Sequence, residues 1–378
     1  MPRLAEIVSE LEQRYDPAWA EPWDAVGLVC GDPDADASSV LLAVDPVAAV
    51  VEEAIASGVQ LVVTHHPLYL GGTTSVAATT AKGRVVHRLL SAGIGLYVAH
   101  TNADVAAPGV SDALGEALGL GDLRPLQPQA GDVQDKLVTF VPVEAVDPIL
   151  DALADAGAGV IGDYRRCAFV GEGTGTFLAG PGTSPTVGEP GRVERVPEVR
   201  LEMVLPRRRR TAVVRALLDC HPYEEPAFDL FELAGVAGPR GLGRVGRLAE
   251  PMSLAAFTAA AARALPATAW GVRATGDPDR VVETVAVCGG SGGGLAAAAA
   301  SAGADVLLTA DLKHHATSEA VDETGIALVD AAHWATEWPW LGAAADALAT
   351  NVKTTVSRIV TDPWTQHAHH SEADEITR

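Results

Sequence analysis

Residues 58–68 constrain the fold most, because an apolar run there ends in two adjacent histidines. Residues 61–63 are apolar and mostly β-branched, which predicts a buried strand with His65 and His66 at its carboxyl end. Pro67 fixes its own φ and favours extended backbone at His66. Neighbouring residues of an extended chain point to opposite sides, so two adjacent metal ions could take one imidazole each. The alternative is a histidine pair that is hydrogen-bonded in a strand–helix loop.

Strands and helices alternate around this run. Residues 3–14 have the apolar spacing of an amphipathic helix, and residues 40–44 predict a strand. A helix is expected over 82–92 and a strand over 93–99. That strand ends at His100, and Asp104 follows four residues later. The alternation predicts an α/β sheet.

The carboxyl part of the chain repeats this order. Residues 301–309 echo residues 56–64, and residues 325–333 echo residues 93–100. His333 is followed by Glu337, as His100 is followed by Asp104. We infer two related α/β halves, each of which ends a strand with a His-x-x-x-acid pair. The alternative is that any two strand–helix units look alike.

Between the halves lies a stretch of different character, rich in Pro and Gly turns. Strands are expected at 137–142, 171–178 and 199–205, and helices at 145–156 and 211–219. This predicts a separate α+β domain inserted between the halves. The expected organisation is an α/β domain over 1–127 and 241–364, an inserted domain over 128–240 and a disordered tail over 365–378.

Charge and composition exclude several classes of protein. The 378 residues include 27 basic and 49 acidic ones, and a net charge of −22 makes nucleic-acid binding unexpected. The four cysteines show no Cys-x-x-Cys spacing, which fits a reduced cytoplasmic protein. A run long and apolar enough to cross a membrane is not seen, nor is a signal-peptide pattern, so cytoplasmic residence is expected.

Five candidate metal ligands all follow strand ends, the edge at which open α/β sheets bind ligands. They are His65, His66, Asp104, His333 and Glu337. The last two share one helix face at i and i+4. Such nitrogen and oxygen ligands suit Zn, Fe, Mn, Co or Ni. A bridging carboxylate would spread them over two ions with positions open for water, as in a catalytic site. His100 could be a ligand, a partner behind a ligand or an acid–base group, and the latter two are favoured.

Several ordered motifs together resemble the Nif-three-like family, whose members are often named GTP cyclohydrolase I type 2 homologues. They are Thr64-His-His-Pro67, His100-Thr-Asn-Ala-Asp104, Cys288-Gly-Gly-Ser-Gly292 and the segments 309–315 and 330–337. The resemblance implies that the five candidate ligands hold two divalent ions, with Glu337 as the bridge. It also implies a toroidal homohexamer. Residues 221–229 resemble long family members whose inserted domain is similar to the PII and CutA-type ferredoxin-like fold.

The resemblance further implies a metal-dependent hydrolase similar to GTP cyclohydrolase I type 2. Water activated by two ions would attack a nucleotide or phosphoester, with His100 or His315 moving protons. A chain of charge −22 would need those cations to accept a small anionic substrate. The alternative is a non-enzymatic hexameric scaffold that handles metal or regulates.

Overall fold

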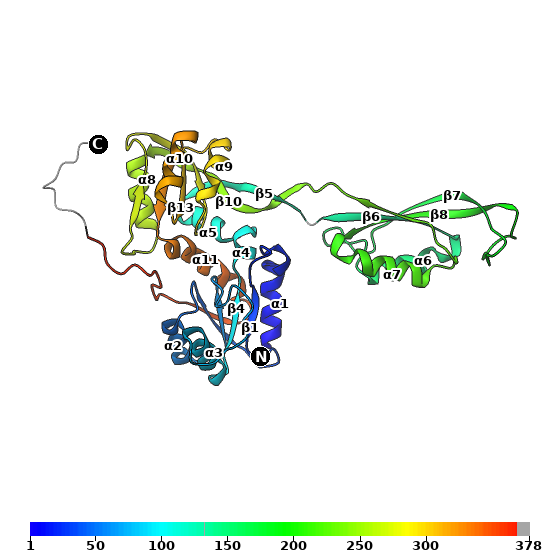
Figure 1. Ribbon diagram of the computed structural model, residues 1–378, viewed down its shortest axis with the longest axis horizontal. Helices are drawn as coiled ribbons and strands as arrows, with labels where there is room; N and C mark the ends of the chain where they lie inside the picture. The colour runs from blue at the N-terminus through cyan, green and yellow to red at the C-terminus, as the bar shows by residue number, and fades with distance from the viewer. Residues whose placement is uncertain (132, 369–378) are drawn as a thin grey trace. The chain divides into compact units, whose positions relative to one another are not determined.

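The computed structural model describes residues 1–131 and 133–368, and its contacts divide the chain into two compact units (Figure 1). The main unit comprises Met1–Gln129 and Gly238–Arg378, and the inserted unit comprises Ala130–Ala237. Of the tail expected over 365–378, residues 369–378 lie outside the described residues. Within its described part, His367 Nδ1 lies 2.9 Å from the carbonyl oxygen of Ala269.

The first sheet of the main unit has five strands in the order β1-β4-β3-β2-β15. They are β1 (Gly27–Cys30), β2 (Ser39–Ala43), β3 (Leu61–Thr64), β4 (Gly95–Val98) and β15 (Lys353–Val356). β2, β3 and β4 run parallel, and β1 is antiparallel to β4. Helix α1 (Leu4–Arg14) packs on one face, whereas α2 (Ala48–Ser57) and α3 (Ala81–Ser91) pack on the other. Burial on both faces explains the continuous apolar run before His65.

The second sheet repeats this arrangement in the order β11-β14-β13-β12-β10-β5. Its strands are β5 (Leu120–Ala130), β10 (Ala237–Ser253), β11 (Val272–Ala274), β12 (Val281–Val287), β13 (Val306–Ala310) and β14 (Ala327–Ala331). β12, β13 and β14 run parallel, and β11 lies antiparallel to β14 as β1 does to β4. One face packs on α9 (Ala296–Ser301) and α10 (His314–Thr324), and the other on α8 (Leu254–Ala264).

One hydrophobic core joins the two sheets. It contains buried residues of β2, β3 and β4 together with those of β12, β13 and β14. Helix α11 (His333–Leu348) contributes Trp340, whose indole N–H donates to the hydroxyl of Tyr15 at 3.1 Å. After α11 the chain returns to the first sheet, because β15 pairs in parallel with β2. The two halves therefore share one interior and hold each other in register.

A buried ion pair fixes β10 where the chain re-enters the main unit. Arg244 is 1% exposed, and its Nε donates to Asp112 Oδ1 at 2.7 Å. Asp112 lies on α5 (Val110–Ala117), which follows the short helix α4 (Thr101–Val105). The same guanidinium donates to the carbonyl oxygens of Ala106, Gly241 and Gly243. A fully hydrogen-bonded guanidinium can lie in the core, whereas an unpaired one could not.

The inserted unit has a four-stranded antiparallel sheet with two helices on one face. The order along the chain is β6 (Gln134–Val141), α6 (Val146–Asp155), β7 (Phe169–Leu178), β8 (Val193–Pro206), α7 (Arg210–Cys220) and β9 (Phe228–Glu232). The sheet order is β7-β8-β6-β9. Apolar residues of α6 and α7 pack against alternate residues of β6 and β8, so the opposite face of the sheet carries no helix among the described residues.

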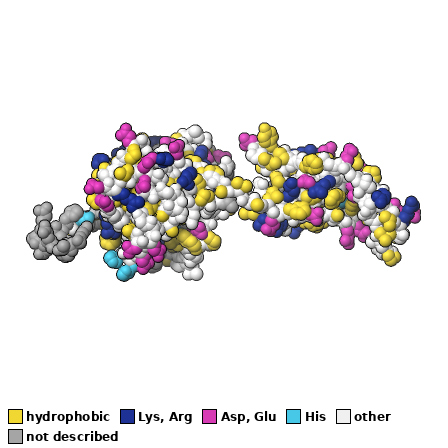
Figure 2. All heavy atoms as spheres, turned by 90° about the horizontal axis from the view of Figure 1, so that it is seen from above, with side chains coloured by type: hydrophobic (Ala, Val, Ile, Leu, Met, Phe, Trp, Pro, Cys, Tyr) yellow, Lys and Arg dark blue, Asp and Glu magenta, His cyan; other side chains and the backbone are white. Residues whose placement is uncertain are grey.

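The surface shows no basic footprint on the face seen in Figure 2, where acidic and basic side chains are interspersed over each unit. This fits the net charge of −22. Among the described residues, no helix is long and apolar enough to cross a membrane.

A buried carboxylate anchors the inserted unit. Asp135 on β6 is 0% exposed and accepts hydrogen bonds from Arg210 Nε at 2.7 Å and Arg207 Nε at 3.0 Å. Both arginines also pair with Glu232. The hydrogen bonds from Arg210 and Arg207 hold the pKa of Asp135 below its ordinary value.

We expect Asp135→Asn to destabilise the inserted unit by about 1–3 kcal/mol at pH 7, because the arginines lose a charged acceptor. A depressed pKa stabilises the fold above the unfolded value of about 3.9, and this stabilisation is lost as the pH falls through the folded value. The difference between the variant and the wild type should therefore shrink below about pH 4. Hydrogen exchange of the β6 and β8 amides, with exposed Asp155→Asn as control, measures both effects. An equal difference at pH 3 and pH 7 would contradict the assignment.

Candidate metal centre

Two adjacent histidines follow the end of β3, and their rings lie side by side with centroids 5.1 Å apart. The amides of His65 and His66 donate to the carbonyl oxygens of Ala43 and Val44, which extends the β2–β3 pairing to this point. The side chain of His65 is 1% exposed and that of His66 is 23% exposed. The ring of His65 packs on the indole of Trp340, with centroids 5.4 Å apart. The inward histidine is thus fixed by the shared core of both halves.

The remaining candidates follow the ends of β4 and β14. His100 precedes α4, which carries Asp104 one turn later. His333 is the first residue of α11, and Glu337 lies one turn further on the same face. The two halves therefore contribute one His-x-x-x-acid pair each to the same cluster.

Glu337 lies at the centre of the cluster. Its Oε1 is 2.9 Å from His333 Nε2 and 3.4 Å from His65 Nε2, and its Oε2 is 3.0 Å from His66 Nε2. Asp104 Oδ1 lies 3.6 Å from His65 Nε2. The structure thus brings together all five predicted ligands, with one carboxylate between imidazoles of both halves.

The outer ring nitrogens each have a hydrogen-bond partner. His66 Nδ1 lies 2.7 Å from Asp45 Oδ1, and His333 Nδ1 lies 2.6 Å from Asp311 Oδ2. His65 Nδ1 lies 2.9 Å from the carbonyl oxygen of Ala99, which can only accept, so this nitrogen carries the proton. Such partners turn the Nε2 lone pairs toward the centre, as in metal sites.

Two inward atoms remain without a hydrogen bond. His65 Nε2 and Glu337 Oε2 are buried, and neither forms a hydrogen bond with a described residue. The 3.0 Å approach of His66 Nε2 to Glu337 Oε2 lacks hydrogen-bond geometry. Buried polar atoms without partners are costly, and a cation between them would satisfy both. The donor set of imidazole nitrogens and carboxylate oxygens suits a divalent transition metal.

The pKa shifts within the cluster also indicate that its buried carboxylates need positive charge beside them. Burial lowers the pKa of His66 and of His333, but Glu337 outweighs it and raises them to about 11 and about 9. Burial opposes ionisation of Glu337, yet His66 and His65 hold its pKa well below the usual range. Burial raises the pKa of Asp104 to about 6. The buried carboxylate requires compensation, which either ring protons or metal ions provide.

His100 faces the cluster but differs from His65, His66 and His333 in its surroundings. A ring nitrogen of His100 lies within 4.8 Å of those of His65 and His66. Its Nδ1 lies 2.9 Å from Asp24 Oδ1, while the other Asp24 oxygen accepts from the amide and hydroxyl of Thr101. Burial and the neighbouring His65 lower the pKa of His100.

His315 is not part of the cluster. Its side chain is exposed near the start of α10, and its ring contacts that of His314, with centroids 5.1 Å apart. Among the described residues, no hydrogen bond or ion pair joins His315 to the other candidates. The chain turns at Asp311, whose φ of 57° is left-handed, before α10 begins. The predicted proton-transfer role of His315 therefore has no support in the geometry.

Three aspartates of the site were not predicted as functional. Asp24, Asp45 and Asp311 each bond the outer nitrogen of one histidine. Asp45 comes directly after the strand expected at 40–44, and this position at a strand end was an available signal. Asp24 and Asp311 lie in loops, so only the folded chain shows which imidazole they contact.

A glycine loop closes the cluster on the side of the second half. The Gly290 amide donates to the hydroxyl of Thr336 at 2.9 Å, and its φ is 65°. A Cβ added there would lie 2.5 Å from Glu337 Oε1 and 3.0 Å from His333 Nε2. Glycine is required for its backbone conformation and for the space that the ligand atoms occupy.

The family model Duf34/NIF3 (NGG1p interacting factor 3) matches residues 2–363. The chain belongs to the Duf34/NIF3 family. A Mycobacterium leprae relative named GTP cyclohydrolase 1 type 2 homolog is 49% identical over 367 residues, which cover 96% of this chain and 95% of the relative. A Mycobacterium tuberculosis relative of the same name is 50% identical, with 96% of each chain covered.

Solved structures share the fold over 96% of the chain. A crystal structure of a Bacillus cereus protein related to NIF3 is 37% identical with a TM-score of 0.74. A Staphylococcus aureus crystal structure is 30% identical with a TM-score of 0.79. Each comparison covers 96% of this chain and 98% of the other chain. The mixed α/β fold is thus shared with other NIF3 proteins.

We expect Gly290→Ala to destabilise this NIF3 protein by about 1–2 kcal/mol from the left-handed backbone alone. The clash with Glu337 should add to this cost and displace the carboxylate. Gly294→Ala is the matched control, because a Cβ there meets nothing within 4 Å. Chemical unfolding compares the two, and equal stability of both variants would show that Gly290 is not constrained in this way.

Proposed function

We propose that this NIF3 protein is a dinuclear metal-dependent hydrolase that resembles GTP cyclohydrolase I type 2 and acts on a nucleotide or phosphoester. The single observation that supports it most is Glu337, a buried carboxylate whose two oxygens face imidazoles from both halves of the main unit. A carboxylate in this position suits a bridge between two ions, with His65, His66, Asp104 and His333 as the other ligands.

Two divalent ions held there would supply Lewis acidity and lower the pKa of water. The protein's own side chains would orient the metal-binding histidines and transfer protons. His100, held by Asp24 and set beside His65 and His66, is placed to take or give a proton. Asp45 and Asp311 would keep His66 and His333 turned inward. The metals would also offset the charge of −22 for an anionic substrate.

The inserted unit supports a second candidate function, a non-enzymatic metal-handling or regulatory scaffold. We infer that this unit is ferredoxin-like and similar to PII and CutA domains. Its β-α-β-β-α-β order and the sheet order β7-β8-β6-β9 support this inference. A toroidal homohexamer stays a prediction from the family resemblance. Cytoplasmic residence is part of the proposal, supported by four free cysteines.

We expect Glu337→Ala to lose metal at both positions, because one carboxylate would serve two ions. The loss in affinity should be at least about 100-fold, since groups behind metal ligands alone contribute about 10- to 100-fold. Elemental analysis of metal per chain, after loading with Mn or Zn, measures it. Glu323→Ala, an exposed acidic residue of α10, is the control. Two ions per chain retained in Glu337→Ala would refute the bridge.

We expect His100→Ala to keep the metals and to lower turnover by about 10²- to 10⁴-fold, the usual contribution of an acid–base group. Mass spectrometry of products from GTP, other nucleotides and phosphoesters measures turnover in metal-loaded protein. His87→Ala, exposed on α3, is the control. Product that requires metal and disappears in Glu337→Ala establishes the hydrolase. Absence of product from fully loaded protein would favour the scaffold instead, and loss of metal in His100→Ala would make His100 a ligand.

A further inference from the structure

Strand β7 of the inserted unit places glycine at every second position. Its sequence runs Phe169-Val-Gly-Glu-Gly-Thr-Gly-Thr-Phe177, with glycines at 171, 173 and 175. Alternate residues of a strand share one face of the sheet. Glycine weakens a strand interior, and where it recurs it often marks close approach of a ligand or another backbone. The three glycines between two phenylalanines form a shallow trough, whose Gly171 end lies under the Phe169 ring, 3.1 Å from where a Cβ would stand.

The trough lies on the sheet face opposite α6 and α7. Gly171 pairs with Arg200 on β8, and Gly173 pairs with Glu198, so these residues share one face. Their neighbour Val199, on the other face, packs with the helices. Phe140 on β6 pairs with Arg200 and continues the open face.

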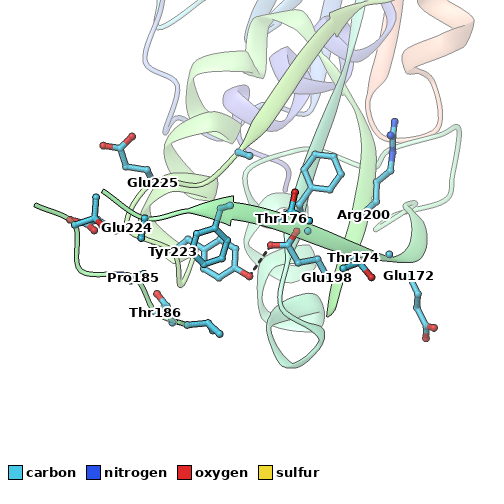
Figure 3. A pocket seen from close by; sticks show the side chains of 18 of the residues that line it. Glu172, Thr174, Thr176, Pro185, Thr186, Glu198, Arg200, Tyr223, Glu224 and Glu225 are labelled. Carbon is cyan, nitrogen blue, oxygen red and sulfur yellow. Dashed lines mark hydrogen bonds between the residues drawn. The ribbon is translucent and has the colours of Figure 1, made fainter. Parts of the chain in front are cut away.

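A cavity of about 860 Å³ occupies this face. Its volume is within the range of about 300–1,000 Å³ that is typical of small-molecule sites. The wall opposite the strand is formed by segments 182–187 and 223–227. Figure 3 shows Tyr223 pointing toward Glu198 across the cavity, with Thr186 on the loop below. The Tyr223 hydroxyl donates to Glu198 Oε1 at 2.9 Å.

The glycines have two different roles here. A Cβ at Gly173 would meet only the carbonyl oxygen of Glu198, at 3.9 Å, so this position opens on the cavity. A Cβ at Gly175 would lie 1.8 Å from Glu198 Oε2. Gly175 therefore lets the Glu198 carboxylate lie against the strand, where it forms part of the floor. The result is an open stretch of backbone at Gly173, with the Phe169 ring on one side and the fixed Glu198 carboxylate on the other.

The ionisable groups of the lining are mostly acidic. They are Glu198, Glu224, Glu225 and Arg200, while Glu172 alternates with the glycines and belongs to the face that carries Val199. Arg200 donates to Glu202 at 2.8 Å, a carboxylate that also pairs with Lys136, and its guanidinium lies over the Phe140 ring, 6.0 Å from the centroid. Arg200 is thus turned to Glu202 and Phe140, which leaves the carboxylates as the remaining charges of the lining. Glu224 accepts from the Ser184 amide at 3.0 Å. The aromatic rings of Phe140, Phe177 and Tyr223 also line the cavity. Aromatic faces and carboxylates both attract organic cations and disfavour anions.

We propose that this cavity binds a small flat organic cation, such as an amidinium, a guanidinium or a protonated nitrogen heterocycle. The planar group lies over the open backbone at Gly173, the rings of Phe177 and Tyr223 pack around it, and Glu198 is its counter-charge. This site lies wholly within the inserted unit and does not depend on the chemistry of the metal cluster.

The test uses the full chain and three probes of the same shape, which are benzamidine, benzamide and benzoate. Calorimetric titration and ligand-observed saturation-transfer NMR measure their binding. We expect benzamidine to bind at least about tenfold tighter than benzamide, because hydrogen bonds to charged groups exceed neutral ones by about that factor. Benzoate should not compete.

Two variants locate the site. Gly173→Val fills the trough with a residue that favours strands, and Glu198→Gln removes the counter-charge without changing size. Each should weaken benzamidine binding by about tenfold or more. Asp155→Asn, the same charge change on exposed α6, should leave it within about twofold. Thermal unfolding confirms that each variant is folded.

Three outcomes overturn the proposal. The first is benzoate binding as tightly as benzamidine, which would make the cavity an anion site. The second is benzamidine binding that Gly173→Val leaves unchanged, which would place the cation elsewhere on the acidic surface. The third is no binding of any probe at millimolar concentration to the folded full chain.

Discussion

The charge of one buried carboxylate organises the main unit. Glu337 is 2% exposed, and a carboxylate at that depth is stable only when positive charge surrounds it. His65 and His66 come from the first half, His333 from the second, and all three direct Nε2 at the same carboxylate. The shared hydrophobic core brings the halves together. The cluster forms only in the alignment that places the histidines of both halves around this carboxylate. The last strand, β15, returns to the first sheet and pairs with β2. The return ties α11, which carries Glu337, to the strands that carry the histidines.

Much of this site could be predicted from the sequence, because the ligands belong to local patterns. His65 and His66 end a continuous apolar run, and His333 and Glu337 have helical spacing. Parallel strands bring their carboxyl ends to one edge, so proximity follows from the order of elements alone. Of the carboxylates that bond the outer histidine nitrogens, Asp45 also follows a strand end, but Asp24 and Asp311 lie in loops and could not be found in this way. Asp311, for example, reaches His333 only because its backbone adopts φ 57° after β13, and nothing in a local pattern specifies that turn.

The secondary structure shows the same difference between elements that a local pattern predicts and elements that depend on distant partners. The helices α1, α3 and α6 and the strands β2, β3 and β7 lie close to their expected positions. The helices have a clear apolar period, β2 and β3 are continuous apolar runs, and β7 lies between Pro/Gly-rich turns. Strands that depend on distant partners were missed, namely β1, β5, β9, β10, β11 and β15. β15 (Lys353–Val356) has only four residues, and its pairing with β2 closes across more than three hundred residues of chain. Long-range pairing of a short strand leaves little trace in the segment itself. The similarity between the two halves is found in the structure as a shared strand arrangement. It holds because it depends on the order of the elements and not on residue identities.

Glycine serves two opposite purposes in the two units. At Gly290 another side chain of the protein occupies the space that a Cβ would need, since Glu337 Oε1 would lie 2.5 Å from that Cβ. At Gly173 no atom of the chain occupies the corresponding space, since the nearest atom is the Glu198 carbonyl oxygen at 3.9 Å. The first glycine allows close packing and gains contacts in return. The second leaves a strand with less side-chain packing and no compensating contact within its own unit. The strand thus leaves open space next to a carboxylate that Tyr223 already holds in place. Such a surface is suited to contact with another molecule.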